Sequence, residues 1–173
     1  GLWKDVRLVV RDAYMFEEVS YIVRFGGDMK PYIIFNFNIS APLKKLIGGS
    51  LSVRVNGHCG DDSFFEGFDK LDRQKAGRLG CCVSNPKLWW PYGYGEANIY
   101  DTVIQLLDGE TVVAEKRLNV GLRKLELKRT ETLEDDNPCF KFIINGKDIM
   151  CRGSNWVPLD AYHSRDKERY AKA

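Results

Sequence analysis

The feature that most constrains this chain is a two-residue alternation of apolar and polar side chains. Successive side chains of a β-strand point to opposite faces, so such alternation is typical of a strand that buries one face. Turn-forming pairs separate the runs, and Asp108-Gly109 is a hairpin signal. No stretch between 1 and 124 has the period of a long amphipathic helix. The pattern predicts an all-β fold, an antiparallel sandwich of immunoglobulin type, with strands at 33–39, 51–55, 79–83, 102–106 and 112–120.

Length and charge limit the class of protein further. The chain has 173 residues, enough for one sandwich of roughly 100 residues plus extra segments, and it needs no metal or disulfide to build a core. Its 26 basic and 24 acidic residues leave a net charge of +2. This balance gives no reason to expect nucleic acid or an anionic membrane as a partner. No apolar run is long enough to span a bilayer.

The cysteines indicate free thiols. There are five of them, an odd number, and none forms a CxxC pair. Cys81 and Cys82 are adjacent, so within a strand they point to opposite faces. Free thiols in a reducing compartment are favoured over a disulfide framework. They slightly favour a cytoplasmic location, but the compartment of the whole protein stays unknown.

The two ends of the chain follow different patterns from its middle. Alternating apolar residues in 2–10 suggest a strand at the very start, and 130–139 is polar and acidic like a surface connection. Asn145-Gly146 predicts a type I′ turn between strands at 140–144 and 148–151, and 165–173 could form a helix. A strand, a loop and a helix open a βα unit, yet a parallel sheet cannot consist of one strand. We therefore expect the chain to be a fragment, cut from neighbouring domains at both ends.

Five motifs follow one another along the chain and carry a resemblance to a known family. They read GLWKDVRL at 1–8, LWWPYGYG at 88–95 with Tyr100, GLR at 121–123, INGK at 144–147 and RGSNWVPLD at 152–160. In this order they resemble glycoside hydrolase family 2. The Asn-Trp-x-Pro-x-Asp ending is similar to the β-mannosidase branch, while exo-β-glucosaminidases and β-galactosidases of the same family stay open as alternatives.

The resemblance implies a modular parent enzyme that hydrolyses O-glycosidic bonds in carbohydrate metabolism. Residues 1–12 would be the last strand of a jelly-roll sugar-binding domain, 13–124 the immunoglobulin-like sandwich, and 125–173 the hairpin and first βα unit of a (β/α)8 barrel. The partners implied are the jelly-roll and barrel domains of the same parent, with a β-linked oligosaccharide or glycoside as the parent's substrate.

The chain itself is expected to be non-catalytic. Glycoside hydrolysis needs two carboxyl groups about 5 to 9 Å apart, and the resemblance places both glutamates beyond Ala173. We therefore assign no catalytic residue and expect this fragment alone to be inactive. The adjacent Asp61 and Asp62 are expected in a solvated turn. No cofactor is implied, and His58 and His163 lie too far apart in sequence to suggest a metal site.

Three residues near the end are candidates for substrate contact in the parent: Asn155, Trp156 and Asp160. They would follow the first barrel strand, and active sites of such barrels lie at the C-terminal ends of strands. An indole can stack on a sugar, and amide or carboxylate groups can bond its hydroxyls. Alternatively, Trp156 packs at the barrel mouth and Asp160 caps the following helix.

Trp89, Trp90 and Arg123 are predicted to lie at a domain interface. Neighbouring tryptophans in a strand face opposite ways, so one is expected in the core and the other at the interface. Arg123 is expected to form an interdomain ion pair or a carbonyl contact. The alternative is an independent carbohydrate-binding module that uses Trp89, Trp90 and Tyr92. Residues 140–160 are expected to lie against the sandwich or against a neighbouring molecule, because their apolar side chains would lack barrel partners.

Overall fold

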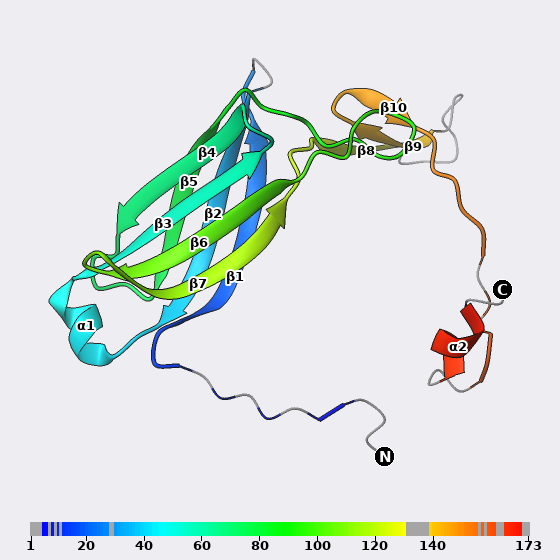
Figure 1. The fold of residues 1–173 in the computed structure, drawn as a ribbon. Helices are drawn as coiled ribbons and strands as arrows, with labels where there is room; N and C mark the ends of the chain where they lie inside the picture. The colour runs from blue at the N-terminus through cyan, green and yellow to red at the C-terminus, as the bar shows by residue number, and fades with distance from the viewer. Residues whose placement is uncertain are drawn as a thin grey trace.

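A computed structural model of the chain describes residues 5, 6, 8, 10, 12–27, 30–130, 139–155, 157, 159–161 and 165–170. It contains a β-sandwich, then a small sheet, then a short helix (Figure 1). The predicted all-β sandwich is confirmed. The elements are β1 (Met15–Phe25), β2 (Pro31–Ser40), α1 (Leu43–Gly48), β3 (Leu51–Cys59), β4 (Ser63–Lys70), β5 (Ala76–Ser84), β6 (Tyr100–Asp108), β7 (Thr111–Val120), β8 (Leu125–Arg129), β9 (Phe140–Ile144), β10 (Lys147–Ile149) and α2 (Asp166–Tyr170).

Seven antiparallel strands pair in the order β1-β2-β5-β4-β3-β6-β7. The contact between β4 and β5 is short, with only Phe64 opposite Ser84 and Phe65 opposite Val83. The sheet folds over at this point, so β1, β2 and β5 form one layer and β4, β3, β6 and β7 form the other (Figure 1). At the far side β1 approaches β7. There the Tyr21 hydroxyl donates a hydrogen bond of 3.4 Å to the carbonyl of residue 119.

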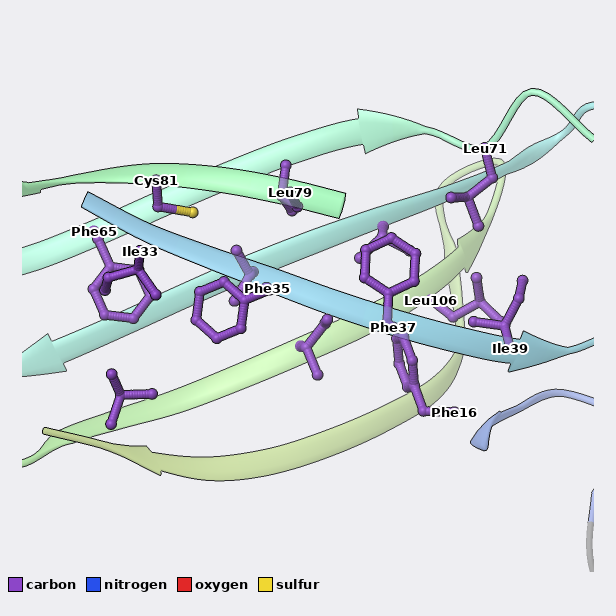
Figure 2. Packing of buried hydrophobic residues seen from close by; sticks show 14 of the residues in the cluster. Phe16, Ile33, Phe35, Phe37, Ile39, Phe65, Leu71, Leu79, Cys81 and Leu106 are labelled. Carbon is purple, nitrogen blue, oxygen red and sulfur yellow. The ribbon is translucent and has the colours of Figure 1, made fainter. Parts of the chain in front are cut away.

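The core lies between the two layers and follows the alternation in the sequence. Ile33, Phe35, Phe37 and Ile39 of β2 are all at most 3% exposed, and they pack against inward residues of β3 and β6 (Figure 2). Phe65 from β4 links two of the aromatic rings, with its centroid 5.8 Å from Phe35 and 5.7 Å from Tyr100. Burial of these side chains from water is the main stabilising contribution to the sandwich.

Two strands of the sandwich, β1 and β4, were not predicted from the sequence. In β1 the register shifts between Phe16 and Glu18, so a bulge breaks the two-residue period. In β4 aromatic residues occupy both faces, and Gly67 stands at an inward position. A Cβ there would lie 2.7 Å from the Cys81 sulfur. Glycine thus permits the close approach of β4 to β5 but removes an apolar side chain from the pattern.

The start of the chain differs from the prediction. Val6, Leu8 and Val10 are 79%, 95% and 89% exposed and lie outside any strand. A strand needs a neighbour for its backbone hydrogen bonds, and no described residue pairs with this segment. The assignment of 1–12 to a preceding domain stays a prediction.

The C-terminal part forms a three-stranded antiparallel sheet in the order β10-β9-β8. Asn145 and Gly146 have φ angles of 51° and 82°, which confirms the predicted type I′ turn between β9 and β10. The helix α2 lies within the predicted 165–173 segment. The barrel itself is not formed by these elements, so the assignment of 125–173 to a (β/α)8 barrel stays a prediction.

Tyr100, at the start of β6, ties the core to the loop that precedes it. Its side chain is fully buried. Its hydroxyl accepts a hydrogen bond of 2.8 Å from the Lys87 backbone N–H and shares another, of 2.5 Å, with the Ser63 hydroxyl. A tyrosine in this place that bonds back to the upstream backbone is a known feature of immunoglobulin-like sandwiches, the tyrosine corner.

Tyr100→Phe should lower the free energy of unfolding by about 1–3 kcal/mol, because it leaves buried hydrogen-bonding groups without their partner. Chemical denaturation measures the change. Tyr92→Phe is the matched control, since Tyr92 is fully exposed and should unfold like the wild type. Equal stability of the two variants would show that the corner contributes nothing.

The cysteines have the orientation that the sequence predicted. All five are free thiols, with Cys81 buried and the adjacent Cys82 exposed. Burial raises the pKa of the Cys81 thiol to about 11, because the thiolate would lose its hydration.

Thiol reagents at mildly alkaline pH should therefore modify Cys82 and Cys151 rapidly, both being exposed, and leave Cys81 untouched until the chain unfolds. Mass spectrometry of peptides after timed labelling measures this order. Labelling of Cys81 at the rate of Cys82 in the folded chain would contradict the burial of the β5 inner face.

Candidate functional site at the joint between the sandwich and the C-terminal sheet

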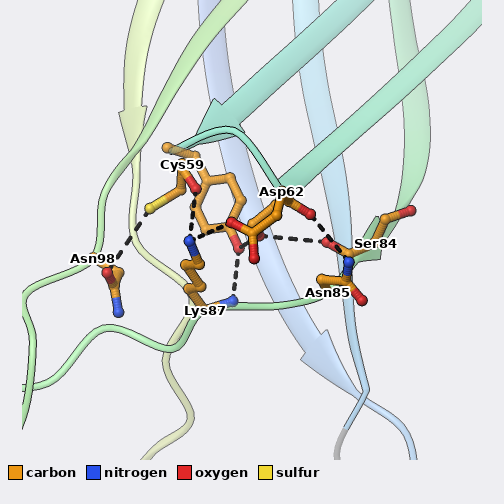
Figure 3. A network of polar contacts seen from close by, with 8 residues as sticks. Cys59, Asp62, Ser84, Asn85, Lys87 and Asn98 are labelled. Carbon is orange, nitrogen blue, oxygen red and sulfur yellow. Dashed lines mark hydrogen bonds and ion pairs between the residues drawn. The ribbon is translucent and has the colours of Figure 1, made fainter.

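The loop of residues 85–99 connects β5 to β6 and carries both predicted interface tryptophans. Its base is attached to the turn between β3 and β4 (Figure 3). The Lys87 ammonium lies 2.5 Å from the Asp62 carboxylate and donates to the Cys59 carbonyl at 3.4 Å. The Asn85 amide donates to the Asp62 carbonyl at 3.1 Å.

The ion pair with Lys87 also affects the protonation of Asp62, which with Asp61 forms the adjacent carboxyl pair in this turn. The hydrogen bond from Lys87 lowers the pKa of Asp62 below its ordinary value, because the ammonium favours the charged form. Asp62 therefore stays ionised and is unsuited to donate a proton. Asp61 is exposed, so the turn is solvated as the sequence indicated.

The two tryptophans do not alternate between core and surface as expected. Both are half-buried, and Leu88 is the residue of this segment that packs against the core. The loop is not a regular strand here. Trp89 forms an isolated β-bridge with Ala97. The backbone N–H of Trp89 donates to the Leu122 carbonyl at 2.9 Å. The segment thus runs across the end of the sandwich, and a two-residue alternation does not apply to it.

Arg123 contacts an aromatic ring where an ion pair or carbonyl contact was expected. Its guanidinium carbon lies 4.7 Å from the centroid of the Trp89 ring. A guanidinium over an indole is attracted by the negative face of the ring. One face of Trp89 is therefore covered by an exposed side chain that follows β7.

Asn145, in the turn between β9 and β10, joins the small sheet to the sandwich. Its side-chain oxygen accepts from the Lys124 N–H at 2.9 Å, and its side-chain nitrogen donates to the Trp89 carbonyl at 3.0 Å. Its own N–H donates to the Lys124 carbonyl at 2.9 Å. Beside it, Ile144 is only 8% exposed. One half-buried side chain thus connects the loop, the linker after β7 and the hairpin turn.

Tyr94 forms a second contact between the loop and the small sheet. Its hydroxyl accepts from the Met150 N–H at 2.9 Å, and the Lys147 ammonium lies 5.3 Å from its ring centroid. A hollow of about 400 Å³ adjoins this contact, lined by Pro91, Tyr92, Gly93, Tyr94, Met150 and Arg152. The expectation that the hairpin lies against the sandwich holds at this end. At the other end Phe140 is 70% exposed.

The predicted substrate-contact residues are only partly described. Asn155 is exposed, and Trp156 lies outside the described residues. The Asp160 side chain is 10% exposed and faces α2, with its carboxylate 3.2 Å from the Arg169 guanidinium. Their role toward a substrate stays a prediction.

A metal or membrane role finds no support in the described part of the chain. His58 is exposed on β3, while His163 lies outside the described residues. Among those described, no group of three or more histidine, cysteine or acidic side chains could hold a metal ion. No helix of the described chain is long and apolar enough to cross a bilayer.

Asn145 was the residue of the joint that the sequence analysis missed. The Asn-Gly pair predicted its backbone conformation, and asparagine is common in such turns for that reason alone. Its side-chain bonds cross 56 residues of sequence to Trp89. Only the position of the loop reveals them.

Comparison with known proteins places this geometry in a family. The family model described as Glycosyl hydrolases family 2 matches residues 36–123. Beta-mannosidase B of Aspergillus clavatus is 36% identical over 173 residues, which covers 99% of this chain and 20% of that protein. Beta-mannosidase B of Neosartorya fischeri is 35% identical, again covering 99% of this chain and 20% of that protein. The chain thus spans about a fifth of the length of these relatives.

Solved structures share the fold. The β-glucuronidase of Ruminococcus gnavus superposes with a TM-score of 0.53 at 19% identity, over 81% of this chain and 19% of that one. A glycosyl hydrolase family 2 member from Bacteroides cellulosilyticus gives a TM-score of 0.57 at 16% identity, over 80% of this chain and 18% of that one. With the family match over 36–123 and the identity to both β-mannosidases, the chain belongs to the glycosyl hydrolases of family 2.

Proposed function

We propose that this chain is a non-catalytic immunoglobulin-like module of a family 2 glycoside hydrolase of β-mannosidase type, and that it holds the catalytic part of the parent in a fixed position. Membership of the family and two relatives named as β-mannosidases support this function. In this proposal 1–12 belongs to a preceding jelly-roll domain, 13–124 is the sandwich, and 125–173 begins the barrel.

The observation that carries the proposal is the set of directed bonds at the joint. Asn145 contributes two side-chain hydrogen bonds and one backbone bond, all between 2.9 and 3.0 Å. Hydrogen bonds depend on angle as well as distance, so the Asn145 bond to the Trp89 carbonyl, together with the Met150 bond to the Tyr94 hydroxyl, limits the orientation of the hairpin relative to the loop. The hairpin continues into the segment that would form the first barrel strand. A fixed joint would therefore carry its position into the catalytic domain.

The contacts to substrate would come from beyond the sandwich. Asn155, Trp156 and Asp160 are proposed to lie near the sugar in the parent, and both catalytic glutamates are proposed to follow Ala173. In the parent the pairing of Asp160 with Arg169 would hold that carboxylate toward α2. The partners proposed are the jelly-roll and barrel domains and a β-linked glycoside.

The alternative of a carbohydrate-binding module built on Trp89, Trp90 and Tyr92 is less well supported. Arg123 covers one face of the Trp89 ring, and the Trp90 ring lies against the backbone of Gly95, where a Cβ would approach within 2.9 Å. Tyr92 projects fully into solvent. These three rings thus do not share one open stacking platform.

Asn145→Gly tests the joint. Glycine keeps the left-handed turn but removes both side-chain hydrogen bonds, which should weaken the attachment of the small sheet by about 1–3 kcal/mol. Hydrogen exchange at the amides of 124–127 and 142–145 should become faster, while the sandwich core keeps its protection. Arg73→Gly is the control, since Arg73 is also left-handed, with φ of 59°, and lies in another turn. Unchanged exchange in Asn145→Gly would contradict the joint.

A second test separates the module from the whole enzyme. The full-length parent should hydrolyse an aryl β-mannoside, and this chain alone should not, because glycoside hydrolysis requires a pair of carboxyl groups at a set distance. Asn145→Gly in the parent should lower kcat/KM and the Tm of the catalytic domain together. Turnover by the isolated chain, after removal of contaminating glycosidases, would refute a non-catalytic role.

A further inference from the structure

The outer face of β3 and β4 carries an arrangement of side chains that the joint does not use. Phe64, Glu66 and Phe68 alternate along β4 and point away from the core, and the two phenylalanines are 49% and 57% exposed. Across from them on β3 stand His58 opposite Phe64, Asn56 opposite Glu66 and Arg54 opposite Phe68. A hollow of about 430 Å³ lies here, lined by Arg54, Val55, Asn56, Glu66, Gly67 and Phe68.

The polar groups of this face are available for a ligand. Neither the Asn56 amide nor the Glu66 carboxylate makes a side-chain hydrogen bond to any described residue. Arg54 is held in place, because its Nε and one terminal nitrogen donate to the Gln105 oxygen at 3.2 and 2.8 Å. Gln105 in turn donates to Glu115 at 2.8 Å. A fixed guanidinium, an amide and a carboxylate therefore border the aromatic rings.

The spacing suits a short chain of linked rings. Residues four apart on a strand are separated by about 13 Å, so Phe64 and Phe68 mark two stacking positions with Glu66 and Asn56 between them. A sugar ring has an apolar face and hydroxyl groups around its edge. Such a ring matches this alternation, because a phenylalanine ring can cover its apolar face while amide and carboxylate groups bond its hydroxyls.

Other ligand classes fit less well. The charges of Arg54 and Glu66 balance, and a carboxylate between the rings would repel a polyanion. A protein interface has an apolar centre depleted of charge, whereas here Glu66 separates the two phenylalanines. The face thus favours a neutral, hydroxyl-rich ligand.

We propose that the outer face of β3 and β4 is an accessory binding site for a neutral oligosaccharide. Phe64 and Phe68 stack against sugar rings, and Asn56 and Glu66 bond the hydroxyls between them. The site lies on the sandwich, apart from the joint at Asn145, so its test is independent of the proposed spacer function.

The experiment titrates this chain with β-linked mannohexaose and follows the amide chemical shifts by NMR. Saturable shifts are expected at 54–58 and 64–68. Phe68→Ala should raise Kd about tenfold, as expected for the loss of one stacked aromatic ring. Phe64→Ala is the second variant, and the wild-type spectrum outside the face reports that each variant is folded. Tyr92→Ala, which removes a fully exposed ring elsewhere, should leave Kd unchanged.

Three outcomes would overturn the site. The first is no shift at the highest oligosaccharide concentration. The second is a set of shifts at 89–94 with binding lost in Tyr92→Ala, which would move the sugar to the loop. The third is protection of the β4 outer face by the rest of the parent chain, seen as slower carbene labelling of Phe64 and Phe68 in the parent than in this chain. That result would assign the face to interdomain packing.

Discussion

The buried hydroxyl of Tyr100 is the interaction on which the rest of this structure depends. A phenol at the edge of an apolar core must find hydrogen-bond partners, because an unpaired buried polar group costs about 1–3 kcal/mol. Here the partners are the Lys87 N–H at 2.8 Å and the Ser63 hydroxyl at 2.5 Å. The ring belongs to the core and the hydroxyl to the loop, so a single residue makes the loop position a consequence of core packing.

The joint with the small sheet follows from that position. The loop begins at the Tyr100 contact, and the Trp89 carbonyl that it presents is the acceptor for the Asn145 side chain at 3.0 Å. Arg123 covers the Trp89 ring and Lys147 approaches the Tyr94 ring. Trp89 and Tyr94 of the loop therefore contact cations and backbone groups of the same chain. This use suits a module whose task is to hold its neighbours in place.

Aromatic residues of the loop and of β4 thus divide their roles. In the loop, Trp89 and Tyr94 make contacts within the chain, whereas Phe64 and Phe68 on β4 stand about half-exposed beside unbonded polar groups. The same residue class serves a joint in one place and offers a surface for a ligand in the other. What differs is that a cation of the same chain already lies over the Trp89 and Tyr94 rings.

Sequence by itself determined the sandwich, because alternation at 33–39, 51–55 and 102–106 requires one buried face whatever the neighbours are. It also determined the Asn145-Gly146 turn, since positive φ angles restrict the residues allowed. The β4 strand was not predicted, because Gly67 and aromatic residues on both faces remove the two-residue period. The outer face with Phe64 and Phe68 was therefore not predicted either.

Only the tertiary structure decided the roles of single residues at the joint. The contacts of Trp89 with Arg123 and Asn145 join segments 34 and 56 positions apart, a separation that local pattern cannot bridge. Position in a motif identified Trp89 and Arg123 as residues of interest but could not say that one would cover the other. Local backbone preference acts between neighbours in sequence, whereas these partners meet because the core, through Tyr100, brings the loop to the end of the sandwich.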